Sequence, residues 1–126
     1  MMDENDISKY VIGAAIEVHK YLGPGLLESV YQQCMVRELQ LHAIDVATEL
    51  VLKGEYKGLK FDIDYRIDML VADKVVVELK VVDSLLPVHK AQLLSYMKLS
   101  GKKLGLLINF NEAVVKDGVK RIVNKL

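Results

Sequence analysis

The feature that most constrains the fold is a long run of alternating apolar and polar residues. From Phe61 to Val71 the odd positions are apolar and the even positions are mainly polar, and the same parity continues from Val75 to Val81. Ala72–Lys74 separates the two runs as a short turn. Because successive side chains of a strand point to opposite faces, the pattern predicts an antiparallel strand pair. We expect its odd face to pack on a core and its even face to carry polar groups.

Ionisable side chains gather on the predicted polar face. With the turn centred on Asp73, Asp68 lies opposite Glu78 and Arg66 lies opposite Lys80, with Cβ atoms about 5 Å apart. Two adjacent carboxylates repel unless one is protonated or a cation lies between them, and hard oxygen ligands suit Mg²⁺ or Mn²⁺. One interpretation is a divalent-metal site for phosphodiester cleavage, in which Lys80 orients water or neutralises developing charge. The alternative is a solvated ladder of cross-strand salt bridges, each contributing less than about 1 kcal/mol.

The remaining elements follow from helical spacing, apolar runs and the Gly23-Pro24-Gly25 break. In chain order we predict helices 7–22 and 26–42, strands 46–52, 61–71 and 75–81, helix 87–99, strand 103–110 and helix 111–125. The order ααβββαβα indicates an α+β sheet with helices packed against it, in a single domain spanning 1–126. Segment 53–58 contains two glycines and is interpreted as a turn between strands.

Composition excludes several classes of protein. The chain has 126 residues, of which 52% are hydrophobic and 27% charged, as in ordinary globular domains. No run approaches the ~18 apolar residues of a membrane span, and the N-terminus is acidic where a secretory signal is basic. The single Cys34 cannot form an internal disulfide or support a zinc site, so we expect a reduced, cytoplasmic protein with Cys34 in its core.

Charge is balanced overall but unevenly distributed. Residues 1–83 hold 15 acidic against 9 basic residues, whereas residues 84–126 hold 2 acidic against 8 basic residues. The basic half could contact phosphates while the acidic half holds cations, and Lys102, Lys103 and Arg121 are candidate contacts. The alternative is that these charges only solvate helix faces.

Helical residues extend the candidate site. Gln92 and Tyr96 lie one turn apart on the face of His89, where they could bind a phosphate, water or Lys80; alternatively they mark a helix edge. Glu28 lies in a first helical turn, where it is either a site residue or a charge favoured by the helix dipole. His19 lies on an apolar stripe and is expected to be a hydrogen-bonded packing residue.

Taken in order, these motifs resemble the PD-(D/E)XK nuclease superfamily. The order of a helical glutamate, an aspartate, E-x-K and Q-x-x-x-Y is similar to its RecB-type exonuclease branch. Gly25–Tyr31 reads GLLESVY and matches the GxxExxY signature of a largely uncharacterised bacterial and archaeal family in that superfamily. The resemblance covers nearly the whole chain and departs from the motif where Ile67 replaces the proline before the aspartate.

The resemblance implies a restriction-endonuclease-like core, an α/β-sandwich-like arrangement with a mixed sheet flanked by helices. It implies a Mg²⁺- or Mn²⁺-dependent nuclease acting on DNA; the alternatives are a catalytically silent nucleic-acid-binding module and an accessory protein-interaction module. A homodimer is one arrangement open to so small a domain. The implied metal ligands are Asp68, Glu78, the carbonyl of Leu79 and, directly or through water, Glu28. The implied catalytic set is Glu28, Asp68, Glu78, Lys80, Gln92 and Tyr96, and the candidate nucleic-acid contacts are His89, Lys102, Lys103 and Arg121.

Overall fold

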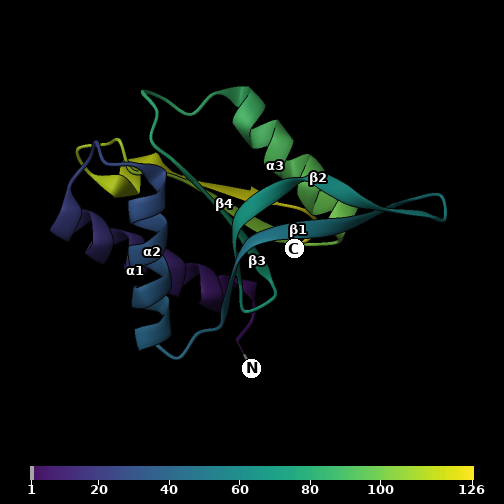
Figure 1. Ribbon diagram of the computed structural model, residues 1–126, viewed down its shortest axis with the longest axis horizontal. Coiled ribbons are helices and arrows are strands. Elements are labelled where there is room, and N and C mark those ends of the chain that lie inside the picture. The colour runs from purple at the N-terminus through teal and green to yellow at the C-terminus, as the bar shows by residue number, and fades with distance from the viewer. Residues whose placement is uncertain (1) are drawn as a thin grey trace.

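A computed structural model describes residues 2–126, in which three α-helices cover a five-stranded sheet (Figure 1). The strands are ordered β1-β2-β3-β4-β5, and all neighbours are antiparallel except β3 and β4, which are parallel. The predicted α+β class with a mixed sheet is confirmed. The elements are α1 (Glu4–Leu22), α2 (Glu28–Leu41), β1 (Val46–Tyr56), β2 (Leu59–Val71), β3 (Val75–Lys80), α3 (Pro87–Ser100), β4 (Leu104–Asn109), the 3-10 helix η1 (Val115–Gly118) and β5 (Val119–Val123).

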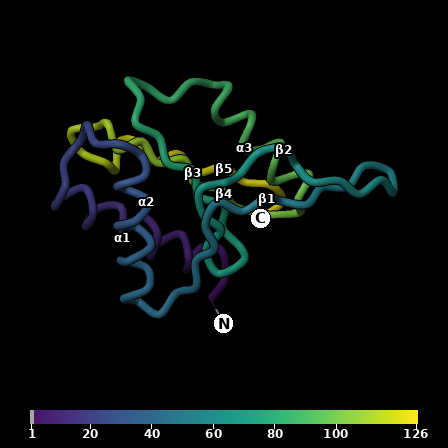
Figure 2. Tube along the Cα trace, viewed as in Figure 1, coloured from purple at the N-terminus to yellow at the C-terminus, as the bar shows by residue number. Residues whose placement is uncertain are grey.

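The sheet separates two hydrophobic cores. Figures 1 and 2 show α1 and α2 on one side of the sheet and α3 on the other. The first core joins α1 and α2 to the sheet, and the second joins α3 to the opposite face. The expectation of one apolar and one polar face is therefore wrong, because even-numbered Leu70 and Val76 are buried beneath α3. No helix in residues 2–126 combines the length and apolar character needed to cross a membrane.

Strand β2 changes the direction of its side chains just before the candidate site. Ile63 and Ile67 belong to the second core, whereas Met69 belongs to the first, so the two-residue alternation breaks between Ile67 and Met69. On the neighbouring strand β1, Glu49 lies between Thr48 and Leu50, which pair with Met69 and Ile67. Glu49 has a φ of 51°, so the backbone of the paired strand is distorted at the same level. The regular alternation used for the prediction therefore does not hold across Asp68.

The predicted C-terminal helix 111–125 is wrong. That segment forms η1 and then β5, which pairs antiparallel with β4. At Gly118, a Cβ atom would lie 2.4 Å from the carbonyl oxygen of Asn109, so the chain makes a contact there that only glycine permits. Beyond Gly118, the β-branched Val119, Ile122 and Val123 favour an extended chain. Strand β5 also supplies hydrogen-bond partners to the edge of β4, which a helix could not do.

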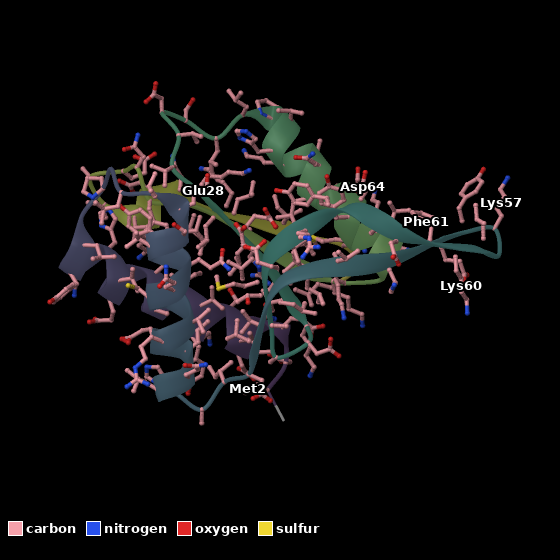
Figure 3. The ribbon with its side chains drawn as sticks, in the orientation of Figure 1. Met2, Glu28, Lys57, Lys60, Phe61 and Asp64 are labelled. Atoms are coloured by element: carbon pink, nitrogen blue, oxygen red, sulfur yellow. The ribbon has the colours of Figure 1, made fainter. Side chains whose placement is uncertain are left out.

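Strands β1 and β2 extend beyond the rest of the sheet as a hairpin arm, comprising Lys53–Asp62 (Figures 1 and 3). Segment 53–58, interpreted as a turn, is strand as far as Tyr56, and only Lys57 and Gly58 turn the chain. Both have positive φ, 45° and 86°, the backbone required by a tight two-residue hairpin turn.

Candidate active site at the end of the β2–β3 ladder

Asp68 and Glu78 are linked where the β2–β3 ladder ends. The backbone pairing stops at Met69 and Val77. At the next position, the backbone N–H of Asp68 donates to Oε1 of Glu78 at 3.0 Å, and the backbone N–H of Leu79 donates to Oδ2 of Asp68 at 2.7 Å. Each carboxylate therefore binds the backbone of the opposite strand, in the register predicted from the turn. Arg66 instead pairs with Val51 of β1, and the β2–β3 ladder does not reach Lys80.

Burial raises the pKa of both carboxyl groups of this pair. Glu78 is only 3% exposed; desolvation first, and the nearby Asp68 charge second, raise the pKa of Glu78 to about 7. Desolvation also raises the pKa of Asp68, with further contributions from the charges of Glu28 and Glu49. Lys80 opposes both pKa shifts. The site is thus a partly buried group of carboxylates with one ammonium nearby.

The helix α3 closes the site from one side. Glu78 and Lys80 line a cavity of about 10 Å³, roughly the space of one water molecule, with His89, Gln92 and Tyr96 of α3. Pro87 occupies the first position of α3, and Gly101 ends it in the left-handed conformation. His89, Gln92 and Tyr96 thus share one face of α3 and line the same cavity as Lys80.

His89 also organises the start of α3. Its Nδ1 accepts a hydrogen bond from the backbone N–H of Leu86 at 3.0 Å. The neutral ring that makes this bond carries its proton on Nε2, which leaves Nε2 as a donor at the rim of the cavity.

A buried tyrosine fixes the loop in front of Glu28. The hydroxyl of Tyr31 donates to the carbonyl of Gly23 and accepts from the backbone N–H of Leu26 at 3.1 Å. The ring stacks on Phe110 with centroids 4.3 Å apart. Glu28 is the first residue of α2 and follows this loop directly (Figure 3). The hydrogen bonds of Tyr31 to the loop therefore help to fix the position of the Glu28 carboxylate. The tyrosine of the GLLESVY segment is thus part of the scaffold.

The ordered motif and its geometry agree with the comparison to known proteins. A sequence model of the PD-(D/E)XK nuclease superfamily matches residues 5–122. The chain belongs to the PD-(D/E)XK nuclease superfamily. Its members are generally nucleases that use divalent metals, and its conserved fold is the restriction-endonuclease-like arrangement seen here.

A solved structure supports the same fold. The crystal structure of SSO0001 aligns with a TM-score of 0.53 and 23% sequence identity, over 78% of this chain. The aligned region makes up 50% of SSO0001, so this chain spans about half of that protein. Among curated proteins, none matches the chain.

Two residues of the candidate site were not identified from the sequence. Tyr65 donates from its hydroxyl to Oε2 of Glu78 at 2.9 Å, and Glu49 contributes to the raised pKa of Asp68. The alternation placed Tyr65 on the core face, because the change of direction before Met69 has no sequence signal. Its one visible signal is a hydroxyl-bearing side chain among otherwise apolar odd positions, three residues before the motif aspartate.

Other candidate residues lie away from this site. Lys102 lies at the opposite end of β4, where its ammonium donates to the carbonyl of Asp73 at 3.0 Å, and Lys103 is its exposed neighbour. Arg121 lies on β5 and donates to the side chain of Asn5 on α1. The structure thus joins His89 to the PD-(D/E)XK residues but not these three basic residues.

His19 and Cys34 both occupy packing positions. Nε2 of His19 lies 2.8 Å from the carbonyl oxygen of Glu112, and the residue is 8% exposed, as expected for a hydrogen-bonded packing residue. Cys34 is partly buried against the first core.

The donor set around Glu78 fits a hard divalent cation in its chemistry. Asp68, Glu78 and the carbonyl of Leu79 offer only oxygen ligands, and a cation between two neighbouring carboxylates would offset their mutual repulsion. Within residues 2–126, no three Asp, Glu, His or Cys side chains are already grouped as a metal cage. An ion at this site would therefore complete its coordination with water or substrate oxygens, as Mg²⁺ does in open sites.

Proposed function

We propose that this protein is a Mg²⁺- or Mn²⁺-dependent nuclease of the GxxExxY group, which hydrolyses phosphodiester bonds in DNA in the cytoplasm. The observation that carries the proposal is the reciprocal bonding of Asp68 and Glu78 at the end of the β2–β3 ladder, with Lys80 two residues further along β3. Residues 1–126 form the nuclease domain in this proposal.

The cation would be held by Asp68, Glu78 and the Leu79 carbonyl, with Glu28 assisting directly or through water. Such a cation polarises a phosphate and lowers the pKa of water. The remaining side chains act on the substrate. The Lys80 ammonium stabilises negative charge that develops on the phosphate, while Gln92, Tyr96 and the Nε2–H of His89 supply neutral hydrogen-bond donors at the cavity rim.

The direct test is metal-dependent cleavage of DNA by purified protein. With Mg²⁺ or Mn²⁺, we expect the wild-type protein to cut DNA, and Lys80→Ala to lower the rate constant by about 10²–10³-fold, the usual effect of losing one preorganised charge-stabilising group. Asp68→Ala should abolish cleavage, with both variants retaining the wild-type circular dichroism spectrum. Lys57→Ala on the hairpin arm is the matched control and should cut normally.

A second function is favoured by one observation. Both motif carboxylates already accept hydrogen bonds from backbone N–H groups, so each has a partner without a cation. A catalytically silent nucleic-acid-binding or protein-interaction module would keep this arrangement. If the wild-type protein cuts neither DNA nor RNA with Mg²⁺ or Mn²⁺, while it binds nucleic acid with a steep salt dependence, this second function replaces the first.

A further inference from the structure

Both carboxylate oxygens of Glu78 are held in place, and by different partners. Oε1 accepts the backbone N–H of Asp68 at 3.0 Å, and Oε2 accepts the hydroxyl of Tyr65 at 2.9 Å. Only the first bond comes from a motif residue. Because a glutamate has three rotatable side-chain bonds, one contact leaves the carboxylate free to swing, whereas two contacts on different oxygens fix its plane.

Tyr65 is itself fixed by α3. Its ring stacks on the ring of Tyr96, with centroids 4.8 Å apart and planes inclined by 18°. Both rings pack against the second core, on the sheet face covered by α3. The stack connects the Q-x-x-x-Y helix to Glu78 through a residue that belongs to neither motif. The stack also gives Tyr96 a role that requires no contact with substrate, because the Tyr96 ring packs on the Tyr65 ring, whose hydroxyl binds the Glu78 carboxylate.

We propose that Tyr65 is the positioning residue for Glu78, and that Tyr96 acts through it by fixing the Tyr65 ring. The inference rests on the proposed function only in taking Glu78 as a metal ligand. A carboxylate oxygen has two lone pairs, so Oε2 can retain the Tyr65 hydrogen bond and still face a cation. Partners of this kind orient metal ligands, and their loss typically lowers metal affinity by about 10–100-fold.

The variant Tyr65→Phe removes the hydroxyl and keeps the ring. Without the Tyr65 hydroxyl, the Glu78 carboxylate moves more freely and releases the Asp68 N–H, so amide hydrogen exchange at Asp68 should accelerate in the metal-free protein. Exchange at the Leu79 N–H, which donates to Asp68, should not change and serves as the internal control. Calorimetric titration with MnCl₂ should show a Kd raised by about 10–100-fold.

Variants at Tyr96 and Tyr56 distinguish the ring stack from the hydroxyl of Tyr65. Tyr96→Phe keeps the stacked ring and is expected to leave Asp68 exchange at the wild-type rate, whereas Tyr96→Ala removes the stack and should accelerate it. Tyr56→Phe, at the exposed end of the hairpin arm, controls for the loss of a tyrosine hydroxyl elsewhere. In cleavage assays, high Mn²⁺ should restore the rate of Tyr65→Phe but not that of Lys80→Ala, because only the former is impaired in holding the ion.

The outcomes separate this inference from the proposed function. Unchanged Asp68 exchange in folded Tyr65→Phe would overturn the positioning role, whatever the wild-type activity. Accelerated Asp68 exchange together with a wild-type protein that binds no Mn²⁺ would support the positioning of Glu78 and contradict the proposed metal-dependent function. Accelerated exchange with weakened Mn²⁺ binding supports both.

Discussion

The pKa of the buried Glu78 side chain is subject to opposing effects. It is 3% exposed, and its pKa is raised to about 7 mainly by desolvation and then by the charge of Asp68. The hydrogen bonds from the Asp68 N–H and the Tyr65 hydroxyl, together with Lys80, oppose this shift without cancelling it. The fold therefore favours protonation of Glu78 more than the unfolded chain does, although the proposed task of Glu78 requires the carboxylate.

This preference predicts how stability depends on pH. Between the ordinary glutamate pKa of 4.5 and about 7, the native state binds more protons at Glu78 than the unfolded state does. The contribution of Glu78 is therefore fully present below pH 4.5 and lost as pH rises through about 7, a change of roughly 3 kcal/mol. Glu78→Gln cannot ionise, so above pH 7 it should be more stable than wild type by up to that amount.

Urea denaturation from pH 4 to 8 with EDTA measures this effect. Glu55→Gln, an exposed site on the hairpin arm, is the control and should follow the wild-type pH profile. A Glu78→Gln profile parallel to wild type would show that Glu78 does not prefer its protonated form in the fold.

At the scale of elements, the loop between α1 and α2 depends on one hydroxyl. Tyr31 is fully buried and satisfies the Gly23 carbonyl and the Leu26 N–H together. Tyr31→Phe leaves these groups without their partner, so it should lower the free energy of unfolding by about 1–2 kcal/mol. Tyr21→Phe, at a residue 90% exposed, is the control and should leave stability unchanged. Equal urea midpoints for wild type and Tyr31→Phe would show that the Tyr31 hydroxyl does not stabilise this loop.

The junction between η1 and β5 depends on the absence of a side chain. An alanine Cβ at position 118 would lie 2.4 Å from the backbone oxygen of Asn109, which cannot move without disturbing β4. Gly118→Ala should therefore lower the free energy of unfolding by about 1–3 kcal/mol, the usual cost of overpacking. Gly13→Ala in α1 meets no atom within 4 Å, and it should stabilise the protein by up to about 1 kcal/mol. Thermal or urea unfolding of both variants tests this contrast.

At the scale of the whole molecule, the distance between Lys80 and Lys103 limits which substrates can contact both residues. The parallel β3–β4 pair runs from Val75 and Leu104 to Lys80 and Asn109, so Lys103 lies roughly 20 Å from Lys80 along the strands. A duplex rises 3.4 Å per base pair, so if it lay along these strands about six base pairs would separate the two positions. A duplex of 20 base pairs can span both positions, whereas a hairpin of four base pairs cannot. Lys103→Glu should therefore weaken binding of the 20-base-pair duplex and leave binding of the four-base-pair hairpin unaffected. Fluorescence anisotropy measures this binding, with Ca²⁺ in place of Mg²⁺ so that the DNA is not cut. Equal weakening of both would contradict this placement.

Patterns with a local physical cause were predicted well from the sequence. The β2–β3 register follows from a turn of fixed length, and α3 follows from Pro87 and Gly101, so Asp68, Glu78, Gln92 and Tyr96 were expected in one site. Glu28 was associated with them through the family motif. What the sequence could not supply depends on tertiary contacts. Val119–Val123 becomes a strand because the edge of β4 needs a partner, and Tyr65 reaches Glu78 because β2 changes direction near Glu49. Long-range pairing of this kind overrides local propensity.

The parallel pairing of β3 with β4 has a consequence for synthesis. Asp68, Glu78 and Lys80 are translated well before Leu104–Asn109, yet β3 has β4 on one side and α3 lies between them in the chain. A growing chain that ends before β4 leaves β3 as an unprotected sheet edge, and α3 has only part of its core to pack on. The β2–β3 hairpin alone can bring Asp68 and Glu78 together, but the core that holds α3 over them includes Leu107 of β4 and is complete only after β4 has been synthesised.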